Sequence, residues 1–328
     1  MTKVVFFVDS ALLPQALEYF DMKRFTGKHV PVKLHMGETG NKYFLQPELA
    51  KQVVDELKDA HAEPFLFDTT VAYPGARHTT QGYQKLAAIH GFTKEKVGCD
   101  VVIDDTGVPT MIERRSFEVA VHLKSATHIL ALSHVKGHIQ SGMGGAIKNF
   151  GMGGVTKETK IKIHHSSRPV YQKDACTYCG VCAEVCPFDA ITVKNNAWKY
   201  KERTCFGCGV CVDVCKSKAL TNKDADMQFL LACSAKACVQ DKTVIYLNEL
   251  KRIARGCDCD PGAGPVICPD IGYLVGDDPV AIDKASLDLI NNVKPDVFKK
   301  INKVDPLKQI KYGEEIGLGS SSYDLIEL

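Results

Sequence analysis

The sequence predicts an α/β fold with a mostly parallel sheet and an inserted α+β module that is rich in cysteine. Apolar runs alternate with amphipathic patterns over residues 1–166, which is typical of a parallel sheet covered by helices. A cysteine repeat occupies residues 167–222, and the α/β pattern returns over residues 223–328. We expect the first and last segments to form one domain. Three successive domains are the alternative, but about 100 carboxy-terminal residues with few strands are a poor basis for a separate core.

The apolar periodicity predicts the elements of this domain one by one. In the first segment, short β-rich runs predict strands at residues 4–8, 29–34, 64–67, 100–103 and 128–132. Amphipathic patterns predict helices at residues 47–60 and 80–90. In the last segment, we expect helices at residues 226–239 and 279–291 and strands at residues 244–247 and 266–268. Six glycines in residues 141–154 predict a loop or the junction of a loop with a helix.

The composition indicates a globular protein whose partners are small molecules or proteins. The 328 residues include 41 Lys and Arg against 39 Asp and Glu, a formal charge of +2, and 45% are hydrophobic. No basic block offers an electrostatic footprint for nucleic acid or anionic lipid. The apolar run at residues 4–8 is too short for a secretory signal, and no apolar stretch approaches a membrane span. We therefore expect a cytoplasmic protein that binds neither nucleic acid nor membrane.

Eight of the 14 cysteines form an internal repeat. Residues 176–186 read CTYCGVCAEVC and residues 205–215 read CFGCGVCVDVC, at a constant offset of 29. In a reducing compartment, so many thiols indicate metal ligands or redox groups rather than disulfides. Each half has the spacing C-x2-C-x2-C-x3-C, in which three thiolates hold one cubane and the fourth reaches across to the other.

This repeat resembles the bacterial two-cluster ferredoxin family over residues 170–222. The resemblance implies two [4Fe-4S] clusters in an inserted ferredoxin-like module, held by two sets of ligands: Cys176, Cys179, Cys182 and Cys215 for one, and Cys205, Cys208, Cys211 and Cys186 for the other. The second half departs from the family at Lys216, where proline is usual. Such clusters exchange single electrons, so we expect low-potential electron transfer with a redox partner such as a ferredoxin or flavodoxin.

Ionisable residues follow several predicted strands. In an open parallel sheet the ligand site lies beyond the carboxyl ends of the strands. The residues found there are His35, Gly37, Glu38, Asp68, Asp104, Asp105, His134, Lys136, His138, Asp277 and Asp278. Each one alone would be a capping or solvated loop residue. Together they indicate a cleft where His35, Glu38, His134 or His138 moves protons and Lys136 or Lys148 holds a small anionic substrate.

The glycine-rich segment is a second candidate feature. Gly142, Gly144 and Gly145 precede Lys148 at a loop-to-helix junction, where backbone N–H groups can hold an anion or cofactor and the lysine can add charge or form an imine. The alternative is an ordinary glycine turn beside a solvated lysine. The pattern is neither G-x-G-x-x-G nor a Walker loop, so it indicates no dinucleotide or nucleoside triphosphate. We interpret His164 and His165 as polar residues of a linker.

The six remaining cysteines divide into two groups. Cys99, Cys233 and Cys238 are expected in the core. Cys257 and Cys259 stand one residue apart in a loop rich in Gly and Asp, with Cys268 beyond them. These three are candidates for an additional metal site or for catalytic thiols, although C-x-C lacks the two-residue spacing of a zinc knuckle.

The whole chain is similar to the uncharacterised iron-sulfur centre protein family, in which a ferredoxin module is set into an α/β domain of unknown function. The matching stretches are VKLHMGETGN at residues 32–41, SHVKGHIQSGMGGAIKNFGMG at 133–153, the cysteine repeat, CDCD at 257–260 and PDIGYLVGDDPVAIDKASLDLI at 269–290.

A weaker resemblance is to the amino-terminal domain of nickel-dependent lactate racemase. That family carries a histidine, a Gly-Gly loop with a lysine tethered to a nickel-pincer nucleotide, and a further histidine that binds nickel. His138, Gly144, Gly145, Lys148 and His164 occur here in that order, with the lysine one position later than in the family. The resemblance implies distant kinship of the fold.

Three functions are compatible with these features. The first is an iron-sulfur oxidoreductase of unknown substrate. The second is an electron-transfer or maturation partner without its own substrate, which would dock an acidic carrier through Lys173, Lys194, Lys199, Lys201, Arg203, Lys216 and Lys218. The third is a racemase-like enzyme with an extra metal or organic cofactor at Lys148. A simple carrier needs only about 55 residues, so the roughly 270 others favour the first.

Overall fold

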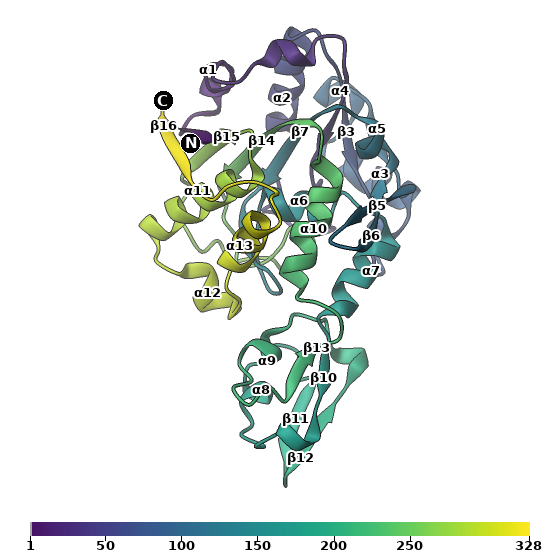
Figure 1. Ribbon diagram of the computed structural model, residues 1–328. Helices are drawn as coiled ribbons and strands as arrows, with labels where there is room; N and C mark the ends of the chain where they lie inside the picture. Colours follow the sequence, from purple (N-terminus) through teal and green to yellow (C-terminus); the bar gives the residue numbers. More distant parts are fainter. Residues whose placement is uncertain (1) are drawn as a thin grey trace.

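The larger lobe is built on an eight-stranded sheet in which only β15 is antiparallel to its neighbours (Figure 1). The computed structural model describes residues 2–328, and within them the strand order is β16-β1-β15-β14-β7-β2-β3-β4. These strands are β1 (Thr2–Phe7), β2 (His29–Lys33), β3 (Glu63–Asp68), β4 (Val101–Ile103), β7 (His128–His134), β14 (Thr243–Leu250), β15 (Gly272–Gly276) and β16 (Tyr323–Glu327). The prediction of a mostly parallel α/β sheet is confirmed.

Helices cover both faces of the sheet, because alternate strand residues present apolar side chains to opposite sides. Val5, Val32 and Leu247 pack under α1 (Leu13–Leu17), α2 (Pro47–Asp59), α3 (Thr80–Ile89) and α4 (Lys94–Val97). Val4, Ile129 and Tyr246 belong to a second core with α6 (Ala146–Gly151), α10 (Met227–Val239) and α11 (Pro279–Val293). The other helices of the larger lobe are α5 (Val121–Ser125), α7 (Lys157–Ser166), α12 (Val297–Asn302) and α13 (Leu307–Glu315). No helix formed by residues 2–328 has both the length and the apolar character needed to cross a membrane.

One predicted strand is wrong and several elements were not predicted. Residues 266–268 form no strand but one isolated bridge, Ala254 to Val266. The prolines at 265 and 269 flank this run and cannot donate to a ladder. The strand lies further on, as β15. Pattern reading also missed β16 and the hairpin of β5 (Gly107–Ile112) and β6 (Arg115–Ala120), as well as the short pair β8 (Lys136–His138) and β9 (Gly142–Gly144).

The cysteine repeat lies in a smaller lobe below the sheet (Figure 1). Its elements are β10 (Pro169–Tyr171), α8 (Val181–Glu184), β11 (Ile191–Lys194), β12 (Ala197–Tyr200), α9 (Val210–Asp213) and β13 (Leu220–Asn222). The two short helices are 29 residues apart, the offset of the cysteines themselves, and β11 and β13 begin at the same offset. The sequence repeat is therefore also a repeat of structure.

The chain enters and leaves the smaller lobe at one place. β10 and β13 pair antiparallel, so that Pro169 faces Asn222. Just outside this pair, the backbone N–H of Lys223 donates to the Arg168 carbonyl at 2.9 Å, and that of Asp224 donates to the Ser166 carbonyl at 3.0 Å. The smaller lobe is thus connected to the rest of the chain through α7, which precedes it, and α10, which follows it.

Candidate active site

A cavity of about 930 Å³ lies between the carboxyl edge of the sheet and the smaller lobe. The loops after β2, β3, β7 and β14 form its upper walls, together with α6 and α7. Val185, Pro187, Phe188 and Phe206 line it from the smaller lobe. These four residues lie within two positions of Cys186 or Cys205 in the sequence. The cavity therefore joins the sheet edge and the cysteine repeat in one space.

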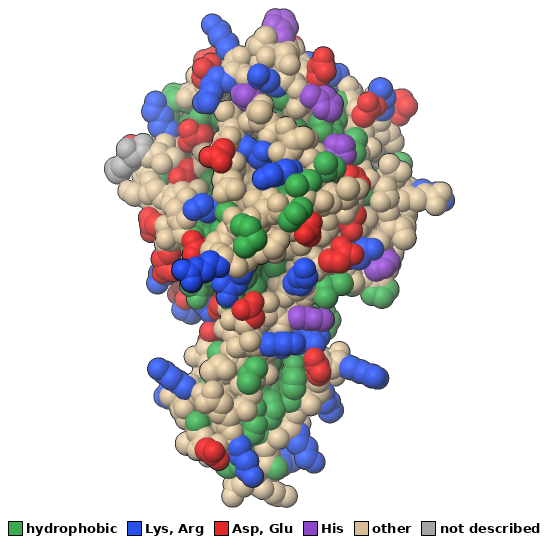
Figure 2. All heavy atoms as spheres, turned by 45° about the vertical axis from the view of Figure 1, so that its right-hand side comes forward, with side chains coloured by type: hydrophobic (Ala, Val, Ile, Leu, Met, Phe, Trp, Pro, Cys, Tyr) green, Lys and Arg blue, Asp and Glu red, His purple; other side chains and the backbone are tan. Residues whose placement is uncertain are grey.

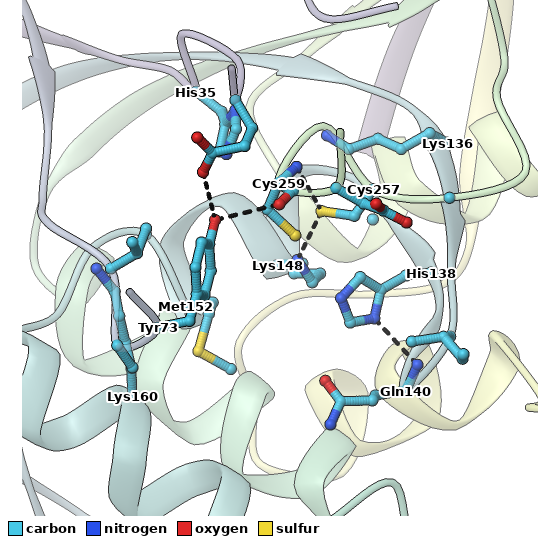
Figure 3. A pocket seen from close by; sticks show the side chains of 18 of the residues that line it. His35, Tyr73, Lys136, His138, Gln140, Lys148, Met152, Lys160, Cys257 and Cys259 are labelled. Carbon is cyan, nitrogen blue, oxygen red and sulfur yellow. Dashed lines mark hydrogen bonds between the residues drawn. The ribbon is translucent and has the colours of Figure 1, made fainter. Parts of the chain in front are cut away.

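The six residues named as catalytic candidates all line this cavity: His35, Glu38, His134, Lys136, His138 and Lys148. Figure 3 labels four of them, His35, Lys136, His138 and Lys148. Gly144 and Gly145 also line it, and so does Asp68. Gly142 does not, because its backbone packs against Val304 and Pro306.

Four predicted carboxylates lie elsewhere. Asp277 and Asp278 follow β15, whose reversed direction puts its carboxyl end at the opposite edge of the sheet. Asp278 instead caps α11, accepting from the N–H of Val280 at 2.8 Å. Asp105 accepts from the N–H of Lys157 at the start of α7, and Asp104 accepts from Thr106. Neither lines the cavity.

The interpretation of His164 and His165 as linker residues is wrong, because both lie in the last turn of α7. His164 lines the cavity, whereas His165 is exposed. Within the described residues, the buried Nδ1 of His164 has no hydrogen-bond partner. Burial, helped by the nearby His138 and Lys148, lowers the pKa of His164 to about 3. The ring is thus neutral at physiological pH.

The N-terminus of α6 holds a carboxylate of the protein itself rather than a ligand. Asp283 accepts from the N–H groups of Ala146 at 2.7 Å and Ile147 at 2.9 Å. The prediction that these backbone groups bind an external anion is therefore corrected. Lys148, the next residue of α6, points into the cavity (Figure 3).

Asp258 fixes the loop that carries Cys257 and Cys259. Its fully buried carboxylate lies 2.8 Å from His134 Nδ1 and 2.8 Å from Lys136 Nζ. His134 Nε2 lies 2.8 Å from the Lys251 carbonyl, so both ring nitrogens are occupied. Although burial acts in the opposite direction, His134 and Lys136 hold the pKa of Asp258 well below its usual range. His134 and Lys136 thus position this loop.

The Cys257 sulfur is surrounded by groups that stabilise a thiolate. Lys148 Nζ lies 3.6 Å from Cys257 Sγ, and the N–H of Cys259 donates to the same sulfur at 3.4 Å (Figure 3). A hydrogen bond with the Cys259 thiol and the positive charge of Lys148 hold the pKa of Cys257 well below its usual value against the effect of burial. The same shared hydrogen bond, together with burial, raises the pKa of Cys259. Cys257 is therefore the thiolate and Cys259 the thiol.

His138 completes this group. Ligand atoms of His138, Cys257 and Cys259 all lie within 4.8 Å of one another, which is close enough for the three to hold one metal ion. His138 Nδ1 accepts from the backbone N–H groups of Gln140 at 3.2 Å and Ser141 at 3.1 Å. Burial, helped by Lys148, lowers the pKa of His138 to about 4. The ring is therefore neutral, with its proton on Nε2. Cys268 is buried outside this cavity.

A second polar cluster on the cavity wall centres on Arg77, which the sequence did not single out. Arg77 is fully buried, with Nε 3.0 Å from Glu38 Oε2 and Nη1 2.5 Å from His35 Nε2. Tyr73 hydrogen-bonds to both Arg77 and Glu38. A guanidinium only donates, so His35 Nε2 accepts. Burial and the Arg77 charge lower the pKa of His35 well below its usual value, so this ring is neutral.

Lys160 of α7 is the other functional candidate that sequence reasoning missed. Its Nζ lies 2.5 Å from Thr69 Oγ1 and hydrogen-bonds to the Thr70 carbonyl. Burial lowers the pKa of Lys160 to about 7. Neither Arg77 nor Lys160 belongs to a motif or follows a strand directly, so no sequence signal marked them. Asp258 did carry one, because it stands between two cysteines.

One family model and several solved structures resemble the chain. The model of a domain of unknown function, DUF362, matches residues 30–288. No curated protein matches. The lactate racemase apoprotein from Thermoanaerobacterium thermosaccharolyticum is 12% identical with a TM-score of 0.40, over 76% of this chain and 50% of that one. A protein from Thermotoga maritima is 9% identical with a TM-score of 0.43, over 93% and 58%. This chain thus spans about half the length of these solved proteins, and neither likeness bears on its function.

Proposed function

The chain belongs to the DUF362 family, and we propose that it is an iron-sulfur oxidoreductase that passes single electrons to a small anionic substrate bound in the cavity. Residues 167–222 would form an inserted ferredoxin-like module with two [4Fe-4S] clusters. The ligands would be Cys176, Cys179, Cys182 and Cys215 for one cluster, and Cys205, Cys208, Cys211 and Cys186 for the other.

Hydrogen bonds to the cysteine sulfurs support this assignment. The N–H of Tyr178 donates to Cys176 Sγ at 3.4 Å, and the N–H of Gly207 donates to Cys205 Sγ at 3.3 Å. These two bonds occupy equivalent positions, 29 residues apart. Such bonds help to set the potential of a cluster. The equivalence of these two bonds supports two clusters related by the repeat.

The observation that carries the proposal is the make-up of the cavity wall. Val185, Pro187 and Phe206 adjoin Cys186 and Cys205, two ligands of the same proposed cluster. That cluster would lie beside the cavity that also contains the titratable groups of the sheet edge. When bound, it would supply or accept one electron at a time.

The residues around the cavity suit an anion that gains electrons and a proton. Lys148 and Arg77 supply positive charge, and neutral His138 and His164 add polar contacts. Lys160, with a pKa of about 7, can donate a proton near neutral pH. Glu38, whose pKa Arg77 lowers despite burial, remains charged and holds Arg77 in place.

Metal analysis of protein purified without oxygen tests the proposal. We expect about eight irons and eight acid-labile sulfides per chain, and electron paramagnetic resonance of the dithionite-reduced protein should show both clusters. Cys186→Ala and Cys215→Ala form a matched pair that each removes one ligand. An anion that binds in the cavity should alter the cluster signal that Cys215→Ala retains and that Cys186→Ala loses. Protein without iron after anaerobic reconstitution would contradict the proposal.

A racemase-like enzyme with an additional metal cofactor is a second candidate. It is favoured by the convergence of His138, Lys148 and His164 on one cavity. Nickel in the metal analysis, or a nucleotide-sized mass adduct on Lys148, would support it. An unmodified intact mass without nickel would exclude it.

A further inference from the structure

Cys257 and Cys259 form a pair of thiols with no role in the cysteine repeat. Both line the cavity, and their sulfur atoms lie within 4.8 Å of each other. Disulfide formation requires a separation of about 2 Å, so the two sulfur atoms would have to approach each other by less than 3 Å. The ring that such a bond closes over three residues is strained, and strained disulfides are readily reduced.

A continuous chain of contacts joins this pair to the proposed cluster. The Gln140 side chain donates to the Phe206 carbonyl at 2.5 Å, and Phe206 follows the proposed ligand Cys205. The backbone N–H of Gln140 donates to His138 Nδ1, and the His138 ring contacts Cys257. The pair is thus connected through two residues to the side of the cavity where electrons would arrive.

The geometry of His138 disfavours a metal ion at this group. Two backbone N–H groups donate to Nδ1, so the proton of the neutral ring is on Nε2. A histidine that binds metal through Nε2 carries its proton on Nδ1 and donates it to an acceptor. Lys148, 3.6 Å from Cys257 Sγ, would add a positive charge next to a cation. The same contacts suit a thiolate, which accepts hydrogen bonds and attracts the ammonium group.

We propose that Cys257 and Cys259 are a redox-active dithiol that forms a reversible disulfide and stores two electrons delivered singly by the clusters. This inference rests on the proposed iron-sulfur function and adds the group that converts one-electron to two-electron transfer.

The reduction balances with groups in the chain and one external donor. Two reduced clusters, each first reduced by a low-potential one-electron carrier, give one electron each to the Cys257–Cys259 disulfide. The sulfur–sulfur bond breaks, Cys257 becomes a thiolate beside Lys148, and Cys259 takes one proton from solvent through the cavity. Both clusters return to their oxidised state. The dithiol can then reduce a two-electron acceptor, such as a disulfide, in the cavity and re-form its own bond.

Thiol labelling of the intact, cluster-loaded chain tests the pair directly. The protein is equilibrated without oxygen in glutathione buffers of increasing oxidising strength. It is then denatured in the presence of iodoacetamide, which labels the free thiols, and digested with trypsin. Cleavage after Arg255 and Lys284 gives one peptide, residues 256–284, that contains Cys257, Cys259 and Cys268. We expect three labels in reducing buffer and one, on Cys268, in oxidising buffer. Cys268→Ser should still lose two labels, whereas Cys259→Ser should form no internal disulfide and lose at most one label, to a mixed disulfide of Cys257 with glutathione that is recognised by its added mass.

Electron delivery is tested on the oxidised protein with a reduced viologen as donor. The two labels should return in the wild type, and return at least tenfold more slowly in Cys186→Ala. Equal rates in both proteins would overturn delivery by the cluster. Three labels in every buffer, a disulfide that includes Cys268, or zinc bound to the pair and released only by a chelator would overturn the dithiol.

Iron analysis of the same samples separates the two proposals. Eight irons with reducible clusters but no change in labelling would leave the iron-sulfur function standing and refute the dithiol. A disulfide that forms in protein unable to bind iron would refute the iron-sulfur function and, with it, reduction by the clusters.

Discussion

Asp258 is not itself among the residues lining the cavity, yet its sequence neighbours Cys257 and Cys259 and its partners His134 and Lys136 are. It is fully buried and holds His134 and Lys136, and it separates the two cysteines of the proposed dithiol. A buried carboxylate beside a buried lysine is favourable only as a complete pair, because removal of one member leaves an uncompensated charge. The position of Cys257 and Cys259 therefore depends on this ion pair.

Asp258→Asn should lower the free energy of unfolding by about 3 kcal/mol, since Lys136 would stay buried without its counter-charge. Urea unfolding of the anaerobic protein measures this. Asp260→Asn, an exposed neighbour in the same loop, is the matched control and should change the free energy by less than about 0.5 kcal/mol. Equal effects of the two substitutions would show that Asp258 has no special role.

His138 should make stability fall on acidification. Its folded-state pKa of about 4 lies below the value of about 6.5 in the unfolded chain, so the unfolded ring binds a proton first as the pH drops. Between pH 7 and pH 5 this costs the wild type about 2 kcal/mol that His138→Gln does not lose. Urea unfolding of both proteins at the two pH values gives the difference. A parallel decrease in both would mean that the folded ring is protonated.

At the scale of elements, the contact between α7 and the smaller lobe explains a difference between the two halves of the repeat. Tyr178 and Gly207 are equivalent positions, and both have positive φ, +55° and +70°. The first half accepts a side chain there. In the second half a Cβ would collide with the His164 carbonyl of α7. Gly207 is therefore required mainly because the smaller lobe packs closely against α7, and its positive φ is a secondary reason for a glycine there.

Gly207→Ala should accordingly destabilise the protein by about 2–3 kcal/mol, through overpacking at the junction. Gly180→Ala is the control, because Gly180 has φ +82° but open space where the Cβ would lie, and should cost about 1 kcal/mol. Thermal unfolding compares the two. Limited proteolysis between the lobes should cut the Gly207 variant faster, and identical digestion patterns would contradict a docking role.

Periodicity predicted the elements whose environment is set locally. The strands β2, β3 and β7 and the helices α2, α3 and α11 were anticipated nearly to their bounds, because their apolar spacing reports one buried face. The expectation that a ligand site lies beyond the carboxyl ends of parallel strands selected six residues that line the cavity, namely His35, Glu38, Asp68, His134, Lys136 and His138. The same expectation failed at Asp278, because the direction of β15 depends on tertiary pairing, which periodicity does not encode. His164 was misread because the docked lobe is what encloses this residue.

At the scale of the whole molecule, the smaller lobe differs in charge from the rest of the chain. Residues 167–222 contain eight Lys and Arg against five Asp and Glu, a net charge of +3, while the full chain carries +2. Figure 2 shows blue Lys and Arg side chains over this lobe. Each proposed cluster with four thiolates is an anion, so part of this positive charge offsets it. The exposed remainder suits an acidic electron carrier.

Reduction by an acidic ferredoxin should therefore slow roughly tenfold when the salt concentration rises from 50 to 300 mM, because screening removes the steering. Lys199→Glu should slow it already at low salt, whereas Lys28→Glu, exposed on the larger lobe, should not. Stopped-flow absorbance of the proposed clusters measures both rates. A rate independent of salt would place the docking surface elsewhere.

The paired strands at the entrance of the smaller lobe have a consequence for how such a protein could arise. Because Pro169 and Asn222 lie opposite each other, the two ends of the intervening segment are adjacent in space. A single insertion or deletion in a gene could add or remove this whole segment, with a short turn closing the gap and every strand of the large sheet left in register. The loss would also remove one wall of the cavity, so an ancestor without the segment would have presented an open cleft to solvent.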